Sequence, residues 1–356
     1  MASRADLIDA TATKTTSRWR LGWIRWALVA VSVGLLIRMS VLGFPEIREG
    51  VAQLLSRSGW LVLGAVFAEV LWTFSLANVY RSSLIGFGGR LGRGGAIRIS
   101  MGAFSLSRIL PGGGAAGSVF AAREMIRLDN PAPATVVSML VSWWVSMMTL
   151  ALIVGLGTAI GVAGGGVGVA HLAGPGVVAG VLVALGGLVA VASRFPRLRV
   201  RVTTGLSRAG ARLGVVAAPE EWEAVAVEGL PVRNLLPLVG WTTLSWLADA
   251  SALWLMFAGF GIMLHPAVLL VGYGLANLIN ALPEVTPGWL GVLETALAAA
   301  YAGLGVPAGA AVVAVLCYRL VSYWLPVAVG IGPALRMLRG RPGPDALQRR
   351  PLEAVA

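Results

Sequence analysis

The chain has 356 residues, of which 57% are hydrophobic and only 12% are charged, and its mean hydropathy is +0.81. Soluble domains carry about 25% charged residues, so this composition excludes a soluble enzyme and indicates one helical domain embedded in a membrane. The net charge of +12 lies in short basic clusters beside apolar segments, which favours membrane flanks over nucleic-acid binding.

Apolar segments separated by short polar turns predict an all-α, polytopic helix bundle. The predicted spans are residues 21–41, 59–80, 132–160, 176–193, 235–259, 267–282 and 308–334, with shorter apolar stretches at 99–110, 112–127 and 288–304. No small-residue cleavage site follows the first segment, which is therefore interpreted as a retained span and not as a signal peptide. Residues 1–20 and 336–356 are expected to be polar tails, so residues 21–335 form a single transmembrane domain.

The basic residues predict the orientation of these spans. If the N-terminus is cytoplasmic and the spans alternate, 23 of the 28 Lys and Arg residues fall on the cytoplasmic side and three fall outside. The longest polar segment, 194–233, is then a cytoplasmic loop. The positive-inside rule therefore predicts a multi-pass protein of the plasma (inner) membrane with both termini in the cytoplasm.

Two proline-glycine breaks indicate an internal repeat. Pro111 and Pro287 are 176 residues apart, and the same offset aligns Pro131 with Pro307. The segments that follow, PAPATVVSMLVSWWVS and PAGAAVVAVLCYRLVS, share their prolines and several apolar residues in register.

The two copies are expected to run in opposite directions, because the charges make the long span of the first copy run outward and that of the second run inward. The sequence thus predicts two inverted repeats, about 96–160 and 272–336, that contain broken or re-entrant helices. Such repeats are typical of transporters, which bind substrate near the midplane between the copies. The alternative is that the breaks only kink two unrelated helices.

Six charged residues lie inside apolar segments: Glu69, Arg108, Asp249, Glu284, Glu294 and Arg319. A charge at the bilayer centre costs at least about 2.5–3.5 kcal/mol, so each should face a cavity or a partner. The 176-residue offset relates Arg108 to Glu284, and this pair is expected to meet beside the two breaks. Glu69 is expected to be an interior hydrogen-bonding residue, and Arg319 either belongs to the site or only bonds helices together.

A helix that begins at a break offers free backbone N–H groups and a positive dipole end to an anion, and a neighbouring guanidinium suits a phosphate. The predicted substrate-binding residues are Arg108, Pro111, Gly112, Gly113, Glu284, Pro287, Gly288, Glu294 and Arg319. The sequence has no hydrolase, metalloprotease or nucleotide-binding motif. One cysteine and two histidines give no basis for a metal site or another cofactor. An enzyme is therefore not expected.

Two motifs carry a family resemblance. The segment LPGGGAAGSVFAAREM occupies residues 110–125, and P-G-x-x-G-x-x-E is matched by Pro287, Gly288, Gly291 and Glu294. A later R-x-x-x-Y-W-x-P is matched by Arg319, Tyr323, Trp324 and Pro326. These segments resemble the flippase-like membrane domain of the lysylphosphatidylglycerol synthase family, and the resemblance covers most of residues 20–335. The first segment departs from the commonest family form, since Ala115, Ala116 and Ser118 stand where a glutamate is usual.

The resemblance implies a protein that moves an anionic lipid or a polyprenyl-phosphate-linked sugar between leaflets. Full-length synthases add a cytoplasmic aminoacyl-transferase domain, which this sequence does not contain, so lipid aminoacylation is not expected. The expected partners are membrane lipids and an envelope-biosynthesis enzyme. Two alternatives remain: a non-transporting membrane partner of an envelope glycosyltransferase, and a membrane-embedded enzyme that acts on a lipid phosphate.

Overall fold

A computed structural model describes residues 58–110, 113–164, 169–192, 219–228, 231–281 and 287–339, together with a few isolated positions. The expected first span, 21–41, and most of both tails lie outside the described residues. Three of the predicted site residues, Pro111, Gly112 and Glu284, also lie outside them.

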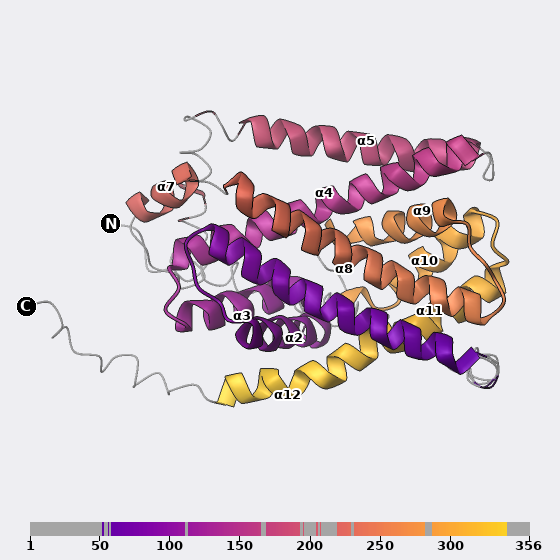
Figure 1. Ribbon diagram of the computed structural model, residues 1–356, viewed down its shortest axis with the longest axis horizontal. Helices are drawn as coiled ribbons and strands as arrows, with labels where there is room; N and C mark the ends of the chain where they lie inside the picture. Colours follow the sequence, from indigo (N-terminus) through magenta and orange to yellow (C-terminus); the bar gives the residue numbers. More distant parts are fainter. Residues whose placement is uncertain are drawn as a thin grey trace, which may run out of the picture.

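Throughout the described part the regular structure is helical, which confirms the all-α prediction (Figure 1). The helices are Ser58–Gly86, α2 (Arg93–Ile109), α3 (Gly113–Arg127), α4 (Ala132–Gly164), α5 (Val169–Ala192), α7 (Pro219–Glu228), α8 (Val232–Gly259), α9 (Pro266–Asn277), α10 (Val292–Gly303), α11 (Ala308–Arg319) and α12 (Leu325–Arg339). Short turns of other helical geometry join them at η1 (Leu278–Ala281), η2 (Pro287–Trp289) and η3 (Leu320–Trp324).

Helices α11 and α12 are continuous through η3 and form one long helix, Ala308–Arg339. Ser58–Gly86, Ala132–Gly164 and Ala308–Arg339 are each long and apolar enough to cross a membrane. Each contains one predicted span, at 59–80, 132–160 and 308–334. The second and third begin in the same way, because the carbonyls of Pro131 and Pro307 accept the first helical hydrogen bonds. A proline suits this position, since a first-turn residue has no helical partner for its missing N–H.

The structure departs from the sequence prediction at three places. Where the span 267–282 is predicted, α9 has only 12 residues, too few to cross a membrane. Helix α5 begins at Val169, not at 176, and carries Pro175 inside it, which membrane helices tolerate. The predicted cytoplasmic loop 194–233 contains a helix, α7, with Pro219 at its start and two acidic residues in its first turn. Both features favour a helix N-terminus, and the buried side chain of Trp222 anchors the helix.

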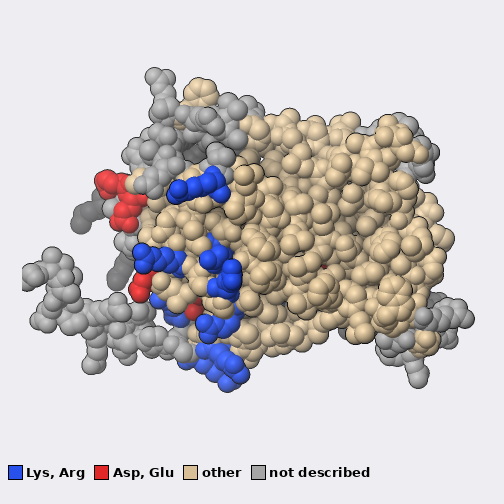
Figure 2. Space-filling model, in the orientation of Figure 1, with Lys and Arg blue, Asp and Glu red and all other residues tan. Residues whose placement is uncertain are grey.

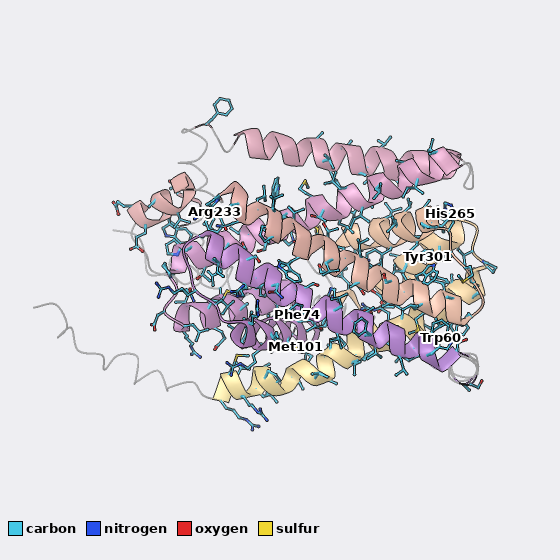
Figure 3. All side chains as sticks on the ribbon, in the orientation of Figure 1. Trp60, Phe74, Met101, Arg233, His265 and Tyr301 are labelled. Carbon is cyan, nitrogen blue, oxygen red and sulfur yellow. The ribbon has the colours of Figure 1, made fainter. Side chains whose placement is uncertain are left out.

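Charged side chains gather at one end of the bundle, which we call the charged end. The loop that precedes α2 and the turn that follows α3 meet there, since the backbone N–H of Arg90 donates to the Asn130 side chain. Arg233, at the start of α8, lies at the same end, whereas Trp60 and His265 lie at the opposite end (Figure 3). Figure 2 shows that the described residues on the rest of this face include no visible Lys, Arg, Asp or Glu.

Two pairs of short helices extend from opposite ends of the bundle. Helices α2 and α3 pack against each other at the charged end, while α9 and α10 pack at the other end (Figure 1). The contact between α2 and α3 is close at Gly117, where a Cβ atom would collide with the carbonyl of Ala103. Each long helix packs on the distant pair: α4 lies against α9, and α12 lies against α2.

The close packing of α12 on α2 depends on Gly330, and Gly332 provides a matched control on the same helix. A Cβ atom at Gly330 would collide with Ser105 Oγ and with the Met101 carbonyl, whereas one at Gly332 meets nothing within 4 Å. We expect Gly330→Ala to cost about 1–3 kcal/mol, the usual cost of overpacking. Thermal unfolding of purified protein in detergent should show a lower melting temperature for Gly330→Ala and none of this loss for Gly332→Ala. Equal stability of the two variants would contradict the packing.

Candidate functional site

The last turn of α2 meets the first turn after the second helix break. Arg108 Nη1 donates a hydrogen bond of 3.0 Å to the carbonyl of Gly288. Gly288 has φ 58°, and a Cβ atom there would lie 2.5 Å from Arg108 Cδ and 2.9 Å from the Tyr323 ring. Glycine is therefore required at this position both for its backbone conformation and for the close approach of Arg108.

Tyr323 lies between two arginines. The guanidinium carbon of Arg108 is 5.4 Å from the centre of the Tyr323 ring and that of Arg319 is 4.4 Å away, both within the range of a cation–π interaction. The Tyr323 hydroxyl also donates to the backbone carbonyl of Arg108 at 3.0 Å. Tyr323 belongs to the turn η3, which has π-helical geometry, a local widening of the helix that is frequent at functional sites.

Arg319 forms a buried ion pair with Glu294. Arg319 Nε and Glu294 Oε1 are 2.6 Å apart, and the two side chains are only 6% and 4% exposed. The second oxygen, Glu294 Oε2, accepts the backbone N–H of Gly291 at 2.7 Å and so caps the start of α10. One carboxylate thus fixes α11 against the N-terminus of α10.

A second polar cluster, formed by Glu69, Asp249, Tyr273 and Tyr318, lies next to this ion pair. The hydroxyls of Tyr273 and Tyr318 donate to the two oxygens of Asp249 at 2.7 and 2.6 Å. Glu69, from the helix Ser58–Gly86, is 2% exposed and interacts with Asp249 and with Arg319. The cluster therefore joins four helices, Ser58–Gly86, α8, α9 and α11, through side chains that lipid would not tolerate.

A narrow cleft lies on the side of the bundle, next to the ring of Phe104. It is lined by Trp72, Thr73, Leu76, Ser100, Met101, Phe104 and Pro326. The Phe104 ring packs edge-on against Trp72 with 4.9 Å between ring centres, and the Arg108 guanidinium lies 4.8 Å from its centre. The space between the atoms of the cleft is about 180 Å³ and includes space open to the outside.

The structure brings together several of the residues that the sequence predicts for the site. Arg108 contacts Gly288, and Glu294 pairs with Arg319, with Tyr323 between the two arginines. Gly113 is buried at the start of α3, and Pro287 begins η2. The predicted pairing of Arg108 with Glu284 falls outside the described residues. A role of these residues in binding substrate stays a prediction.

Sequence reasoning placed Glu69 and Asp249 inside the membrane but missed their place beside the site. It expected Glu69 to form hydrogen bonds, yet both of its carboxylate oxygens lack a donor among the residues that the structure describes. Tyr273 and Tyr318 could have predicted the position of Asp249, since a tyrosine hydroxyl in an apolar helix needs a hydrogen-bond acceptor. In the described part of the chain, no three His, Cys, Asp or Glu side chains come together in a way that would hold a metal ion.

Long apolar helices, two helix pairs with glycine at their breaks, and a buried network of charges define a polytopic helical membrane protein with a polar centre. The chain matches the family described as the lysylphosphatidylglycerol synthase TM region over residues 23–330. The protein therefore belongs to this family, whose description names the transmembrane region and not a catalytic domain.

Two relatives from Methanothermobacter thermautotrophicus are each named UPF0104 membrane protein. One is 33% identical over 87 residues, which are 24% of this chain and 26% of the relative. The other is 28% identical over 107 residues, 30% of this chain and 29% of the relative. The chain thus spans less than a third of the length of either relative.

The buried ion pair predicts a strong coupling between Glu294 and Arg319. Arg319→Met leaves the buried Glu294 carboxylate without its cation, and Glu294→Gln removes the carboxylate that Arg319 Nε contacts, so each should cost about 3–5 kcal/mol. The double variant should lose less stability than the sum of the two single losses, because both single variants lose the same contact. Melting temperatures of the four proteins in detergent measure the cycle.

The exposed pair Arg127–Glu124 serves as the control for this cycle. Its arginine side chain is 39% exposed, so Arg127→Met should change stability by less than about 1 kcal/mol. If the losses from Arg319→Met and Glu294→Gln simply add in the double variant, the two residues do not depend on each other and the pairing is wrong.

Proposed function

We propose that this protein moves an anionic lipid, or a sugar carried on a lipid phosphate, between the two leaflets of the plasma membrane. The observation that carries the proposal is the contact between the Arg108 guanidinium and the Gly288 carbonyl, where the two broken helix pairs meet. This contact places a cation beside backbone groups at the break, in the interior of a protein whose long helices cross the membrane. A lipid phosphate is the anion that a membrane supplies in quantity, and a guanidinium suits its geometry.

The lengths of the short helices support re-entrant hairpins. Helices α2 and α3 have 17 and 15 residues, and α9 and α10 have 12 each. At 1.5 Å per residue even α2 extends only about 25 Å, less than the hydrocarbon core of about 30 Å. We infer that α2–α3 enters the bilayer at the charged end and returns to it, while α9–α10 does the same from the other side.

The positions of the helices support an inverted repeat. Shifting α4, Ala132–Gly164, by 176 residues gives 308–340, and the observed helix is Ala308–Arg339. The same shift carries Ser58–Gly86 to 234–262, close to α8 at Val232–Gly259. The packing of the two copies is also reciprocal, because the long helix of each copy lies on the broken helix pair of the other copy. A two-fold relation between the copies accounts for this exchange.

The cleft beside Arg108 suits the apolar part of a lipid. Its lining residues are mostly apolar or aromatic, and the Phe104 ring connects it to the guanidinium. A lipid phosphate at Arg108 would leave its chains in such a lateral opening, in contact with the bilayer, while the polar headgroup crosses through the protein interior. In this proposal the lipid enters where the helix Ser58–Gly86, α2 and α12 meet, and these helices separate during transport.

The charges support a cytoplasmic location of the charged end. Arg127 ends α3, and Arg336 and Arg339 lie in the last turn of α12. The visible basic side chains lie together over this end (Figure 2). The positive-inside rule then orients both termini to the cytoplasm.

Transport depends on Arg108 in this proposal. Liposomes would carry fluorescent phosphatidylglycerol in both leaflets, and a membrane-impermeant quencher would report the fraction that reaches the outer leaflet. Wild-type protein should move the labelled lipid from the inner to the outer leaflet, where the quencher reaches it. Arg108→Ala should reduce the rate of this movement to that of protein-free liposomes. Arg98→Ala is the matched control, because Arg98 is an exposed arginine on the same helix and should retain the wild-type rate.

Two results would contradict the transport proposal. Normal movement by Arg108→Ala would remove this residue from the mechanism. If the wild-type protein moves neither phosphatidylglycerol nor a polyprenyl-phosphate-linked sugar, the protein does not transport these lipids. A non-transporting partner of an envelope glycosyltransferase then becomes the better description.

The orientation makes a separate prediction. Reporter fusions at residues 85–95, 200–230 and 345 should be active as cytoplasmic reporters, and a fusion at residue 165 should be active outside. The reason is that the first three lie at or beyond the basic helix ends, whereas residue 165 follows the opposite end of α4. A cytoplasmic signal at residue 165 would refute this orientation and the inverted repeat with it.

A further inference from the structure

Glu69 is a buried acid that the proposed lipid site does not use. Its side chain is 2% exposed, and neither carboxylate oxygen has a hydrogen-bond donor in the described part of the chain. It lies beside another acid, Asp249 of α8, with which it would share a hydrogen bond if one of the two carried a proton. A buried carboxylate without a donor is costly, since it loses its hydration and gains nothing in return.

The surroundings of Asp249 decide which acid holds the proton. Both oxygens of Asp249 already accept hydroxyl protons, from Tyr273 at 2.7 Å and from Tyr318 at 2.6 Å. These two bonds stabilise Asp249 as an anion, because each oxygen acts as an acceptor. Glu69 has no such donors, so a proton placed on Glu69 would satisfy it by donation to Asp249.

The other charged groups around Glu69 do not replace that proton. Arg319 of α11 is the cation that acts on Glu69, but its Nε is paired at 2.6 Å with Glu294 of α10. One guanidinium is therefore shared by three carboxyl groups among the described residues here. If all three were ionised, two negative charges would be left uncompensated in the bilayer, whereas one proton on Glu69 leaves only one, on Asp249, which two hydroxyls solvate.

We propose that Glu69 and Asp249 form a buried proton-binding site, with the proton on Glu69 when the helices are packed as in this structure. The proton is taken from water, forms an O–H bond on the Glu69 carboxylate and returns to water when that bond breaks. Its release leaves two adjacent carboxylates, whose repulsion separates the helix Ser58–Gly86 from α8. The same helix borders the cleft beside Arg108, so the release of the proton opens the lipid site. This last step rests on the proposed function, whereas the proton site itself does not.

Infrared difference spectroscopy on the purified protein tests the proton site without any lipid transport. Wild-type protein at neutral pH should show the carbonyl band of a protonated carboxylic acid, shifted in heavy water and lost at high pH. In Glu69→Gln the band should be absent, while the melting temperature is retained, because the amide N–H donates to Asp249 as the protonated acid does. Glu220→Gln, an exposed acid on α7, should keep the band.

The possible outcomes distinguish the proton site, its effect on transport and the proposed function. A wild-type protein with no acid band at neutral pH, or a band that persists in Glu69→Gln, overturns the proton site. The wild-type titration alone decides the matter if Glu69→Gln does not fold. In liposomes, a transmembrane pH gradient should change the lipid exchange rate of the wild type but not that of Glu69→Gln. If the gradient does not change the lipid exchange rate of the wild type, the proton site does not control the lipid site. If the wild type shows the acid band but moves no lipid, only the proposed function is refuted.

Discussion

A helix end that is buried inside a protein exposes carbonyl groups that have no water to bind, and the fold of this protein depends on how these carbonyls are satisfied. At the end of α2, the carbonyl of Arg108 accepts the hydroxyl of Tyr323, which comes from the distant helix Ala308–Arg339. At the second break, the carbonyl of Gly288 accepts the side chain of Arg108 itself. Arg108 is thus an acceptor through its backbone and a donor through its side chain. The two breaks stabilise each other, and neither pair of short helices is complete without the rest of the bundle.

The ion pair of Glu294 and Arg319 fixes how its helices lie against each other more than it stabilises the fold. Burying two charges costs about as much as their attraction returns, so an apolar pair of the same volume would stabilise the bundle as well or better. An apolar pair would not, however, hold the Gly291 N–H or orient a cation over the Tyr323 ring. The charges therefore fix the register of α10 against α11 and keep Tyr323 in place between the arginines. Loss of one partner is predicted to be severe because the remaining charge stays buried without the contact that this ion pair provides.

Hydropathy and charge were enough to predict the long helices and the all-α fold, because lipid imposes a minimum length and an apolar surface on each span. The 176-residue offset also related Arg108 to the second break, where the structure places its contact with Gly288. Side-chain partners were harder to predict. Spans such as α4 are apolar on all sides, so the sequence does not reveal which face of a span points inward. The bonds from Tyr273 and Tyr318 to Asp249 depend on that rotation. Helix α7 was missed because its anchor, Trp222, is the one tryptophan in a polar segment and gives no periodic pattern.

The π-helical turn at Leu320–Trp324 has a geometric consequence for the joint between α11 and α12. A turn of this kind holds an extra residue, and it can migrate along a helix without unwinding it. A residue that the turn passes as it migrates rotates about the helix axis by about 100°, the angle between successive residues of an α-helix, whereas the helix on either side keeps its phase. A shift of one residue would turn Tyr323 out of the space between Arg108 and Arg319 while every other helix stayed in place. The joint between α11 and α12 can therefore reposition one aromatic side chain while the axis of the helix stays in place.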